Sequence, residues 1–204
     1  MKSPAYWSSA WYEFFMKRVW RQSESMREQQ WKALVPWIPK GAQVVEVAAG
    51  TGRFYRGLLA GHVGDYLALD INPAFVAYLE RQGIPARLSD IRTDPVPPAD
   101  VVVMVAAFYH FKERGPEMLN KLLDATRNRL IILEPVGLDM RRAGWQNRLR
   151  AALVNIGEGP IYNRYCREEF EALCLASGAL EYGGPLPGNT HLCVLRGRHP
   201  GGRQ

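Results

Sequence analysis

The sequence predicts an α/β fold with a doubly wound, mostly parallel sheet, and two observations carry this prediction. Five apolar runs rich in β-branched residues alternate with helical patterns, which is typical of parallel strands joined by right-handed crossovers. Two further runs near the end flank the turn-rich sequence GGPLPGN, which favours an antiparallel return. The seven expected strands cover residues 43–47, 66–70, 86–89, 100–106, 129–134, 179–182 and 192–196.

Local start signals support the helices between these strands. Asn72 suits the cap of a helix whose first residue is Pro73. The pair Gly115-Pro116 has a similar place before an amphipathic stripe of Met118, Leu119, Leu122 and Leu123.

Two regions fall outside the alternation of strands and helices. Residues 1–40 hold five of the six tryptophans, and we expect them to form an N-terminal helical cap. Residues 135–165, with Trp145 on an apolar helical face, are expected to form a cap insertion in a domain that covers residues 41–197. A flexible tail is expected over 198–204. Both caps would lie over the carboxyl ends of the strands, where such sheets bind ligands.

Composition bounds the class of protein. The 204 residues leave room for one α/β domain, and 26 basic against 20 acidic residues give a net charge of +6. This charge permits nucleic acid, an anionic lipid surface or an acidic small substrate, and requires none of them. The three cysteines form no CxxC pair, so neither a disulfide framework nor a zinc site is expected. We find no signal peptide and no apolar stretch of about 18 residues, and expect a cytoplasmic protein without a transmembrane segment.

The sequence VVEVAAGTGRF (residues 44–54) predicts a strand, a tight glycine turn and a helix start. A dinucleotide fingerprint would place a third glycine where this chain has Tyr55. The Glu46 carboxylate would also lie close to a pyrophosphate, and no GK[ST] follows as in a P-loop. A carboxylate at the end of the strand suits a ligand with a cationic group instead.

This stretch resembles the glycine-rich first motif of class I S-adenosylmethionine-dependent methyltransferases, of the small-molecule type that includes the quinone-biosynthesis enzymes. It departs from that motif in Ala48, where glycine is usual, and this methyl group would narrow the space beside the methionine moiety. The resemblance covers residues 37–196 and implies a Rossmann-like seven-stranded sheet with an antiparallel last strand and an N-terminal helical lid. It also implies S-adenosylmethionine as the methyl donor and S-adenosylhomocysteine as the product.

The resemblance assigns cofactor contacts to residues along the chain. Asp70 and Asp90 follow Gly50 at intervals of 20 residues; Asp70 would bind both ribose hydroxyls and Asp90 the adenine amino group. Ile71 would pack on adenine, and the backbone of Ile91 would meet the ring edge. The remaining expected contacts are Glu46, Ala48, Gly50, Gly52 and Arg53 in the first motif, Ala106 at the end of the fourth strand, and Tyr12, whose ring would cover the cofactor.

The exit of the fourth strand points to the class of acceptor. The sequence FYHF (residues 108–111) resembles a signature of small-molecule methyltransferases, whereas amino-methylating enzymes of DNA carry [N/D]PP[Y/F] there. We therefore expect no specific nucleic-acid partner. His110 is the best-placed general base, followed by Tyr109 and, more weakly, by Tyr162 and Tyr165. No metal is expected.

Several alternatives remain open at this point. The N-terminal region is expected to be a helix docked by its aromatics, a lid over an aromatic or lipidic substrate, or a membrane-surface helix with weak peripheral contact. Arg141, Arg142 and Arg148 could hold an anionic group on the acceptor. The expected activity is methyl transfer to an O, N or C nucleophile of a small molecule, by a monomer or homodimer. Its rivals are a binding or scaffold protein of the same fold with little activity, and a nicotinamide-dependent oxidoreductase.

Overall fold

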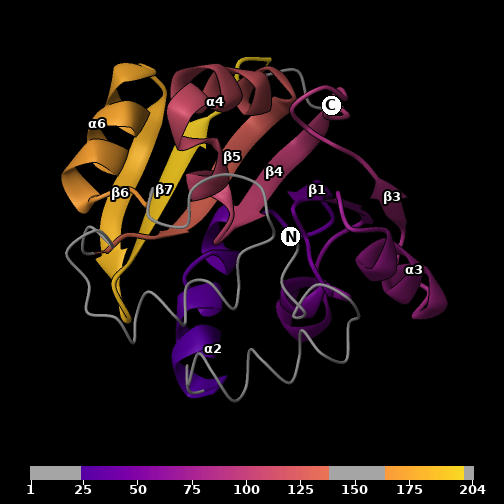
Figure 1. Cartoon of the computed structure of the whole chain (residues 1–204). Coiled ribbons are helices and arrows are strands. Elements are labelled where there is room, and N and C mark those ends of the chain that lie inside the picture. The colour runs from indigo at the N-terminus through magenta and orange to yellow at the C-terminus, as the bar shows by residue number, and fades with distance from the viewer. Residues whose placement is uncertain (1–23, 138–163, 200–204) are drawn as a thin grey trace, which may run out of the picture.

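The computed structural model describes residues 24–137 and 164–199. One seven-stranded sheet with the order β3-β2-β1-β4-β5-β7-β6 forms its centre (Figure 1). Strands β1 to β5 are parallel, and β7 runs antiparallel to both of its neighbours. The strands are β1 (Gln43–Val47), β2 (Asp65–Asp70), β3 (Ala86–Leu88), β4 (Ala99–Val105), β5 (Thr126–Pro135), β6 (Leu180–Leu186) and β7 (Thr190–Arg196). The predicted seven strands and the antiparallel last strand are confirmed.

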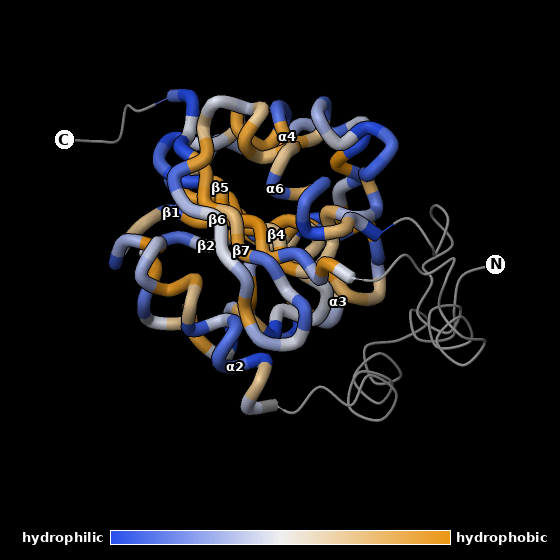
Figure 2. The backbone as a smooth tube through the Cα atoms, turned by 90° about the vertical axis from the view of Figure 1, so that its left-hand side faces the viewer, coloured by the Kyte–Doolittle hydropathy of each residue, from blue (hydrophilic) through white to orange (hydrophobic). Residues whose placement is uncertain are grey.

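Helices cover both faces of this sheet, as in a doubly wound fold. The helices α4 and α6 lie on one face and α2 and α3 on the other (Figure 1). The central strands β1, β4, β5 and β7 are buried on both sides, so hydrophobic residues concentrate in the centre of the molecule (Figure 2). The helices are α2 (Glu24–Lys32), η2 (Val35–Trp37), η3 (Tyr55–Leu59), α3 (Pro73–Arg81), η4 (Phe108–Arg114), α4 (Gly115–Asp124) and α6 (Arg167–Ala176).

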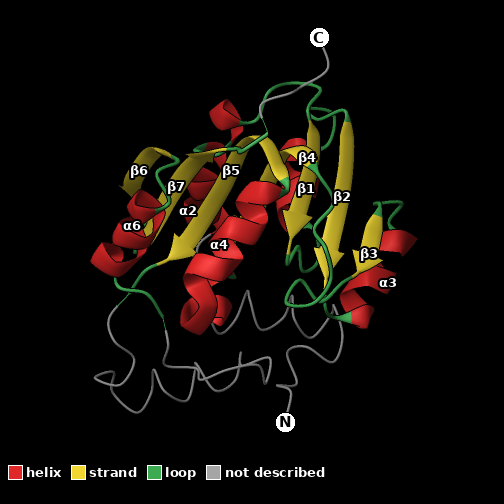
Figure 3. Ribbon diagram, turned by 90° about the horizontal axis from the view of Figure 1, so that it is seen from above, coloured by secondary structure: helices red, strands yellow, loops and turns green. Residues whose placement is uncertain are grey.

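The predicted helix starts are confirmed for α3 and α4. The Asn72 side chain accepts a hydrogen bond from the Ala74 N–H at 3.0 Å, and Pro73 is the first residue of α3. Helix α4 begins at Gly115 with a proline in its first turn, and its predicted apolar stripe is buried against the sheet. The arrowheads of β1, β2, β3 and β5 point toward one edge of the sheet, so the ends of these strands and the starts of the following segments meet there (Figure 3).

One expected turn is shorter than the sequence suggested. The sequence GGPLPGN was read as a turn, but its first four residues belong to β6 and pair with β7. Only residues 187–189 turn, and Asn189 has the positive φ of 54° that the return requires. Strand β6 is an edge strand, which tolerates Pro185 because the missing N–H is not needed on the open side.

The described part of the N-terminal region is docked on the core. The Trp31 ring lies 6.0 Å from that of Phe54, and the Trp37 ring lies 5.3 Å from that of Tyr182. The Gln30 side-chain amide donates to Thr190 Oγ1 at 2.9 Å, which ties α2 to the start of β7. In residues 24–137 and 164–199, no helix is long and apolar enough to cross a membrane.

The expected cap insertion lies mostly outside the described residues, as do Tyr12, Trp145, Tyr162 and the three arginines Arg141, Arg142 and Arg148. Its described ends lie together, because the Gly137 N–H donates to the Tyr165 carbonyl at 3.2 Å. Both described ends of this segment therefore lie at the carboxyl end of β5. The domain boundaries remain predictions.

Packing in the glycine turn predicts a stability effect at Gly52. This residue has φ +68°, and a Cβ added to it would lie 2.5 Å from Leu79 Cδ2 in the core. Gly52→Ala should lower the free energy of unfolding by about 2 kcal/mol or more, since left-handed strain and overpacking add. Gly61→Ala is the matched control, because φ is +78° there and a Cβ would meet nothing within 4 Å. Urea denaturation that gave equal losses for the two variants would contradict the packing argument.

Candidate active site

Two alanines mark the point where the chain order of the sheet reverses. Strands β1 and β4 are neighbours in the sheet, and Ala48 and Ala106 follow their ends. Both residues have φ 56°, a left-handed conformation that costs a non-glycine residue about 1–2 kcal/mol. Doubly wound sheets bind ligands at this switch point, and strained residues gather at functional sites.

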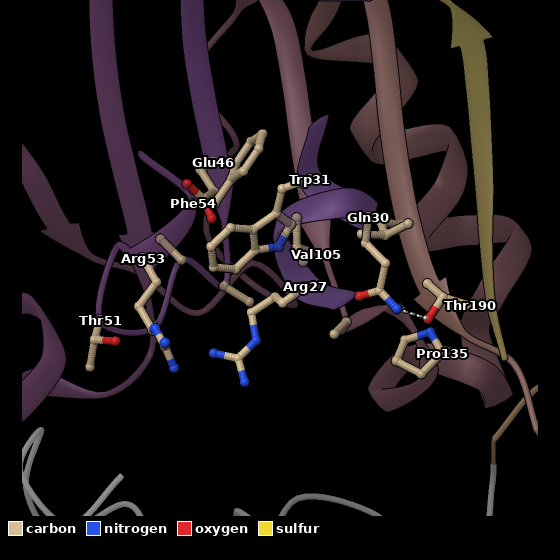
Figure 4. Close-up of a pocket in the computed structure, with 15 residues that line it drawn as sticks. Arg27, Gln30, Trp31, Glu46, Thr51, Arg53, Phe54, Val105, Pro135 and Thr190 are labelled. Atoms are coloured by element: carbon tan, nitrogen blue, oxygen red, sulfur yellow. Dashed lines mark hydrogen bonds between the residues drawn. The ribbon is translucent and has the colours of Figure 1, made fainter. Parts of the chain in front are cut away.

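Two cavities open here, and Ala48 lines both of them. We name them the β2-side cavity and the α2-side cavity. The β2-side cavity has a volume of about 220 Å³ and is lined by Val47, Ala48, Leu69, Asp70, Ile71, Ser89, Asp90, Ile91, Arg92, Ala107, His110 and Phe111. The α2-side cavity (Figure 4) has a volume of about 120 Å³ and is lined by Arg27, Gln30, Trp31, Glu46, Ala48, Ala49, Gly50, Thr51, Arg53, Phe54, Val105, Ala106, Leu133, Pro135 and Thr190.

The structure brings most of the residues expected at the site to these two cavities. Those on the β2 side are Ala48, Asp70, Ile71, Asp90, Ile91 and His110. Those on the α2 side are Glu46, Ala48, Gly50, Arg53 and Ala106. Gly52 and Tyr109 line neither cavity, and Tyr12 lies outside the described residues. Glycine is needed at position 52 because φ is positive there and a side chain would collide with Leu79.

Asp70 connects the glycine turn to the end of β2. Its Oδ2 accepts from the Gly50 N–H at 2.7 Å, and its Oδ1 accepts from the Asn72 N–H at 2.8 Å. A carboxylate has about four acceptor positions, and Asp70 lines the β2-side cavity. Gly50 itself has φ 58°, which a side chain would oppose.

Asp90 is held by a neighbouring arginine. Arg92 Nε donates to Asp90 Oδ1 at 2.8 Å and Arg92 Nη2 donates to Asp90 Oδ2 at 2.7 Å, and both residues of this bidentate ion pair line the β2-side cavity. These hydrogen bonds lower the pKa of the Asp90 carboxyl, which stays ionised at neutral pH. From α4, Lys121 Nζ donates to the Ile91 carbonyl at 2.6 Å and fixes the backbone beside it.

Ser89 is a site residue that the sequence reasoning missed. Its hydroxyl is buried in the β2-side cavity and has no hydrogen-bond partner among the described residues. A buried hydroxyl without a partner costs free energy, so its position indicates a ligand group there. The sequence ARLSDI placed Ser89 beside Asp90, but only the fold shows that its side chain faces the cavity.

On the α2 side, Glu46 is hydrogen-bonded to a tyrosine that stacks on a second tyrosine. It accepts a hydrogen bond from the Tyr66 hydroxyl at 2.6 Å, and the Tyr66 ring stacks on Tyr55 at 4.0 Å. Burial raises the pKa of Glu46 to about 7, against the opposing effect of the Tyr66 hydrogen bond. Tyr55 stands where a dinucleotide fingerprint would have its third glycine. Its ring packs on Tyr66, the residue that donates to Glu46.

Glu134, at the end of β5, is a second buried carboxyl that the sequence reasoning missed. Its Oε2 accepts from the Phe108 N–H at 3.0 Å and its Oε1 from the Tyr109 N–H at 3.3 Å. Burial raises the pKa of Glu134 to about 8. Its position at a strand end, like that of Asp70, was the available signal. Glu134 shapes the exit of β4 and lines neither cavity.

The two expected general bases lie in different environments. His110 lines the β2-side cavity, and its ring lies 4.1 Å from that of Tyr109. Burial raises the pKa of Tyr109 to about 12, so this phenol stays protonated near neutral pH and is a poor base. Of the weaker candidates, Tyr165 is buried in the core against Phe108, away from both cavities.

Helix α2 contributes a wall that the sequence reasoning did not assign to a site. Arg27, Gln30 and Trp31 lie on one helix face at i, i+3 and i+4 and line the α2-side cavity (Figure 4). Arg27 is 6% exposed, and its guanidinium lies over the Trp31 ring at 5.8 Å. The i, i+4 spacing of arginine and tryptophan was visible in the sequence, but the strand ends that it faces were not.

The raised pKa of Glu134 predicts how stability depends on pH. The folded state binds this proton more tightly than the unfolded chain, whose carboxyl pKa is near 4.5. The free energy of unfolding should therefore fall as pH rises from 5 to 8, by at most about 1.4 kcal/mol per pH unit for this group. Glu134→Gln should flatten this slope, whereas Glu117→Gln on the exposed face of α4 should leave it unchanged.

Urea denaturation between pH 5 and 8 measures these slopes. The raised pKa of Glu46 also makes the free energy of unfolding fall over this pH range. Each variant is therefore compared with the wild type and not with a pH-independent profile. Parallel profiles for the wild type and Glu134→Gln would show that the Glu134 carboxyl is not buried as described.

The fold and the glycine turn match a known family. Residues 45–129, from β1 into β5, match the family described as "Methyltransferase domain". This match decides against a nicotinamide-dependent oxidoreductase. No curated protein matches the chain in sequence.

Solved structures of methyltransferases share the fold. Magnesium protoporphyrin IX methyltransferase from Synechocystis PCC 6803, with bound S-adenosylhomocysteine, is 14% identical with a TM-score of 0.64, over 85% of this chain and 84% of that chain. A putative methyltransferase in complex with the Haloferax volcanii Trm112 activator is 14% identical with a TM-score of 0.70, over 98% and 100%. Human N-acetylserotonin methyltransferase in complex with S-adenosylmethionine is 15% identical with a TM-score of 0.64, over 93% and 55%.

At these identities the likeness is one of fold, and the family match supplies the chemistry. It covers the glycine turn, the ends of β2 and β3, and β4 with its exit, which line the β2-side cavity and part of the α2-side cavity. The chain therefore contains a class I S-adenosylmethionine-dependent methyltransferase domain and is an enzyme of the methyltransferase class.

Proposed function

We propose that this methyltransferase acts on a small-molecule acceptor, with the adenosine of S-adenosylmethionine in the β2-side cavity and the acceptor in the α2-side cavity. The observation that carries this proposal is that Ala48, at the switch point of the sheet, lines both cavities. Two of the structural neighbours are named for small molecules, magnesium protoporphyrin IX and N-acetylserotonin, which is consistent with such an acceptor.

The residues of the β2-side cavity fit an adenosine group. Asp70 lines the cavity with a carboxylate, a group that can accept from ribose hydroxyls, and the buried Ser89 hydroxyl has no partner among the described residues. Ile71 and Ile91 offer apolar surface to the base. Asp90 would accept the adenine amino group in addition to its bonds from Arg92, since a carboxylate can accept several donors.

The α2-side cavity offers both charges that a methionine moiety needs. The Glu46 carboxyl and the Arg53 guanidinium line the same cavity, one suited to an ammonium group and the other to a carboxylate (Figure 4). S-adenosylmethionine supplies an already activated methyl group. The protein then aligns an O, N or C nucleophile and excludes water from the site. The general base expected for a hydroxyl acceptor is His110, which lines the β2-side cavity, so the acceptor hydroxyl would have to lie near Ala48, which lines both cavities.

The remaining partner assignments follow from charge. A net charge of +6 without a nucleic-acid motif at the β4 exit supports weak, salt-sensitive nucleic-acid association only. We also propose that the protein is a monomer or a homodimer and that its contact with membranes, where there is one, is weak and peripheral.

The donor site predicts a loss of affinity in Asp70→Ala. This variant should bind S-adenosylmethionine more weakly by about 2–3 kcal/mol, because the ribose hydroxyls and two backbone N–H groups lose their acceptor. Ser89→Ala should cost less, since it removes one hydrogen bond. Titration calorimetry measures both, with circular dichroism to show that each variant is folded. Unchanged affinity in folded Asp70→Ala would remove the adenosine assignment.

Binding and transfer are then measured separately on the wild type. Release of S-adenosylhomocysteine in the presence of a panel of small phenols, amines and carboxylates supports a small-molecule acceptor. Tight donor binding with no transfer to any of them would favour a scaffold protein of this fold.

Glu46 predicts a pH dependence of donor binding. The ionised carboxylate attracts a cation, and in the empty site its pKa is raised to about 7 by burial. The dissociation constant of S-adenosylmethionine should therefore fall between pH 5.5 and 7, by up to about tenfold per pH unit, and then level off. Glu46→Gln should remove this dependence. The Tyr66 hydrogen bond lowers the pKa of Glu46, so Tyr66→Phe should raise this pKa. The pH at which the dissociation constant levels off should then be higher. An affinity that does not change with pH in the wild type would contradict the role of Glu46.

A further inference from the structure

Helix α2 is docked on the fold through buried polar residues. Within residues 25–32, the two buried residues are Arg27 and Gln30, which are 6% and 4% exposed. A surface helix is normally held by an apolar stripe, whose burial is non-directional. Hydrogen bonds are directional, so the position of α2 depends on the partners that its buried polar groups find.

Gln30 uses both hydrogens of its side-chain amide on the β6–β7 turn. Its Nε2 donates to the Pro187 carbonyl and, at 2.9 Å, to Thr190 Oγ1 (Figure 4). The helix and the turn approach closely. Gly188 has φ +77°, and a Cβ added there would lie 3.0 Å from Gln30 Nε2 and 2.7 Å from Met26 Sδ. Gln30 therefore ties α2 directly to this turn.

The next residue, Trp31, ties α2 to the segment that follows the glycine turn. Its ring centroid lies 6.0 Å from that of Phe54, and a Cβ added to Gly57 would lie 3.7 Å from its ring. Helix α2 thus bridges the segment after β1 and the β6–β7 turn, two parts of the fold that are distant in the sequence.

This bridge forms one wall of the α2-side cavity. Gln30, Trp31 and Thr190 line the cavity. Glu46 and Arg53, to which the proposed function assigns the methionine moiety, line it as well. A shift of α2 would therefore change the part of the site that holds the amino-acid end of the donor. Among the described residues of α2, none lines the β2-side cavity, so that cavity would keep its shape.

We propose that Gln30 is a positioning residue for the methyl donor, because it fixes α2 on the β6–β7 turn and so holds Trp31 as a wall beside the amino-acid end of S-adenosylmethionine. This inference rests on the proposed function. It makes α2 contribute to the binding of the methionine moiety and not to that of adenosine.

The test compares two ligands that differ in the methionine part. S-adenosylhomocysteine carries adenosine and the amino-acid end, whereas 5′-methylthioadenosine carries adenosine without that end. Titration calorimetry on the full chain measures the binding of both. Gln30→Met keeps the length of the side chain and removes both hydrogen-bond donors. It should weaken S-adenosylhomocysteine binding about fivefold or more, the loss expected for hydrogen bonds of a buried amide, and change 5′-methylthioadenosine binding less than about twofold.

The matched control is Gln29→Met, the same substitution at the neighbouring residue on the exposed side of α2. It should leave both affinities within about twofold of the wild type.

Thr190→Val removes one acceptor with little change of shape and completes a double-mutant cycle. Since Gln30 acts through Thr190, the double variant and Gln30→Met should bind S-adenosylhomocysteine equally, to within about twofold. Thr190→Val leaves the Pro187 carbonyl as a partner of Gln30, so this milder variant carries the ligand comparison if circular dichroism shows that Gln30→Met is unfolded.

Three outcomes would overturn the inference: folded Gln30→Met binds S-adenosylhomocysteine as the wild type does, it loses affinity for both ligands equally, or the effects of the two substitutions add. Equal affinity of the wild type for the two ligands, or binding of neither, would instead overturn the proposed function, and the inference with it.

Discussion

The site depends on one carboxylate, that of Asp70, which holds two backbone segments in place. Its oxygens accept from the Gly50 N–H and the Asn72 N–H, so the turn after β1 and the start of α3 are connected to the end of β2. Asn72 in turn caps α3 through the Ala74 N–H. Since backbone groups near a cavity need partners when water is excluded, this carboxylate holds the backbone of the glycine turn in place.

A similar arrangement lies on the other side of the switch point. Glu134, at the end of β5, accepts from the Phe108 and Tyr109 N–H groups and so holds the exit of β4. On each side, a strand-end acid from the outer strand fixes the backbone that follows the inner strand. Between them, Ala48 and Ala106 share φ 56°. The strained conformation of these two residues persists because the surrounding hydrogen bonds hold the backbone that follows them.

Much of this architecture could be predicted from local sequence. The β-branched runs predicted the strands, Asn72-Pro73 predicted a helix start, and the strand-end position of Asp70 predicted a place at the site. The misses have a common cause. The first half of GGPLPGN has turn composition but pairs with β7, because the ladder available on that side outweighs local preference. The sequence contains Ser89 and Glu134 but does not show that they are buried. Their burial depends on α4, η4 and the neighbouring strands.

The sequence by itself determined the alternation of elements, the glycine turn and the spacing of the strand-end acids, because these features depend on residues close together in the chain. Only the tertiary structure decided that Ala48 lines two cavities and that Arg27 and Trp31 of α2 form a wall of one of them. It also decided which acids are buried enough for their pKa to rise, as at Glu46 and Glu134. Burial and convergence arise from contacts between distant segments, and local residue preferences do not encode those contacts.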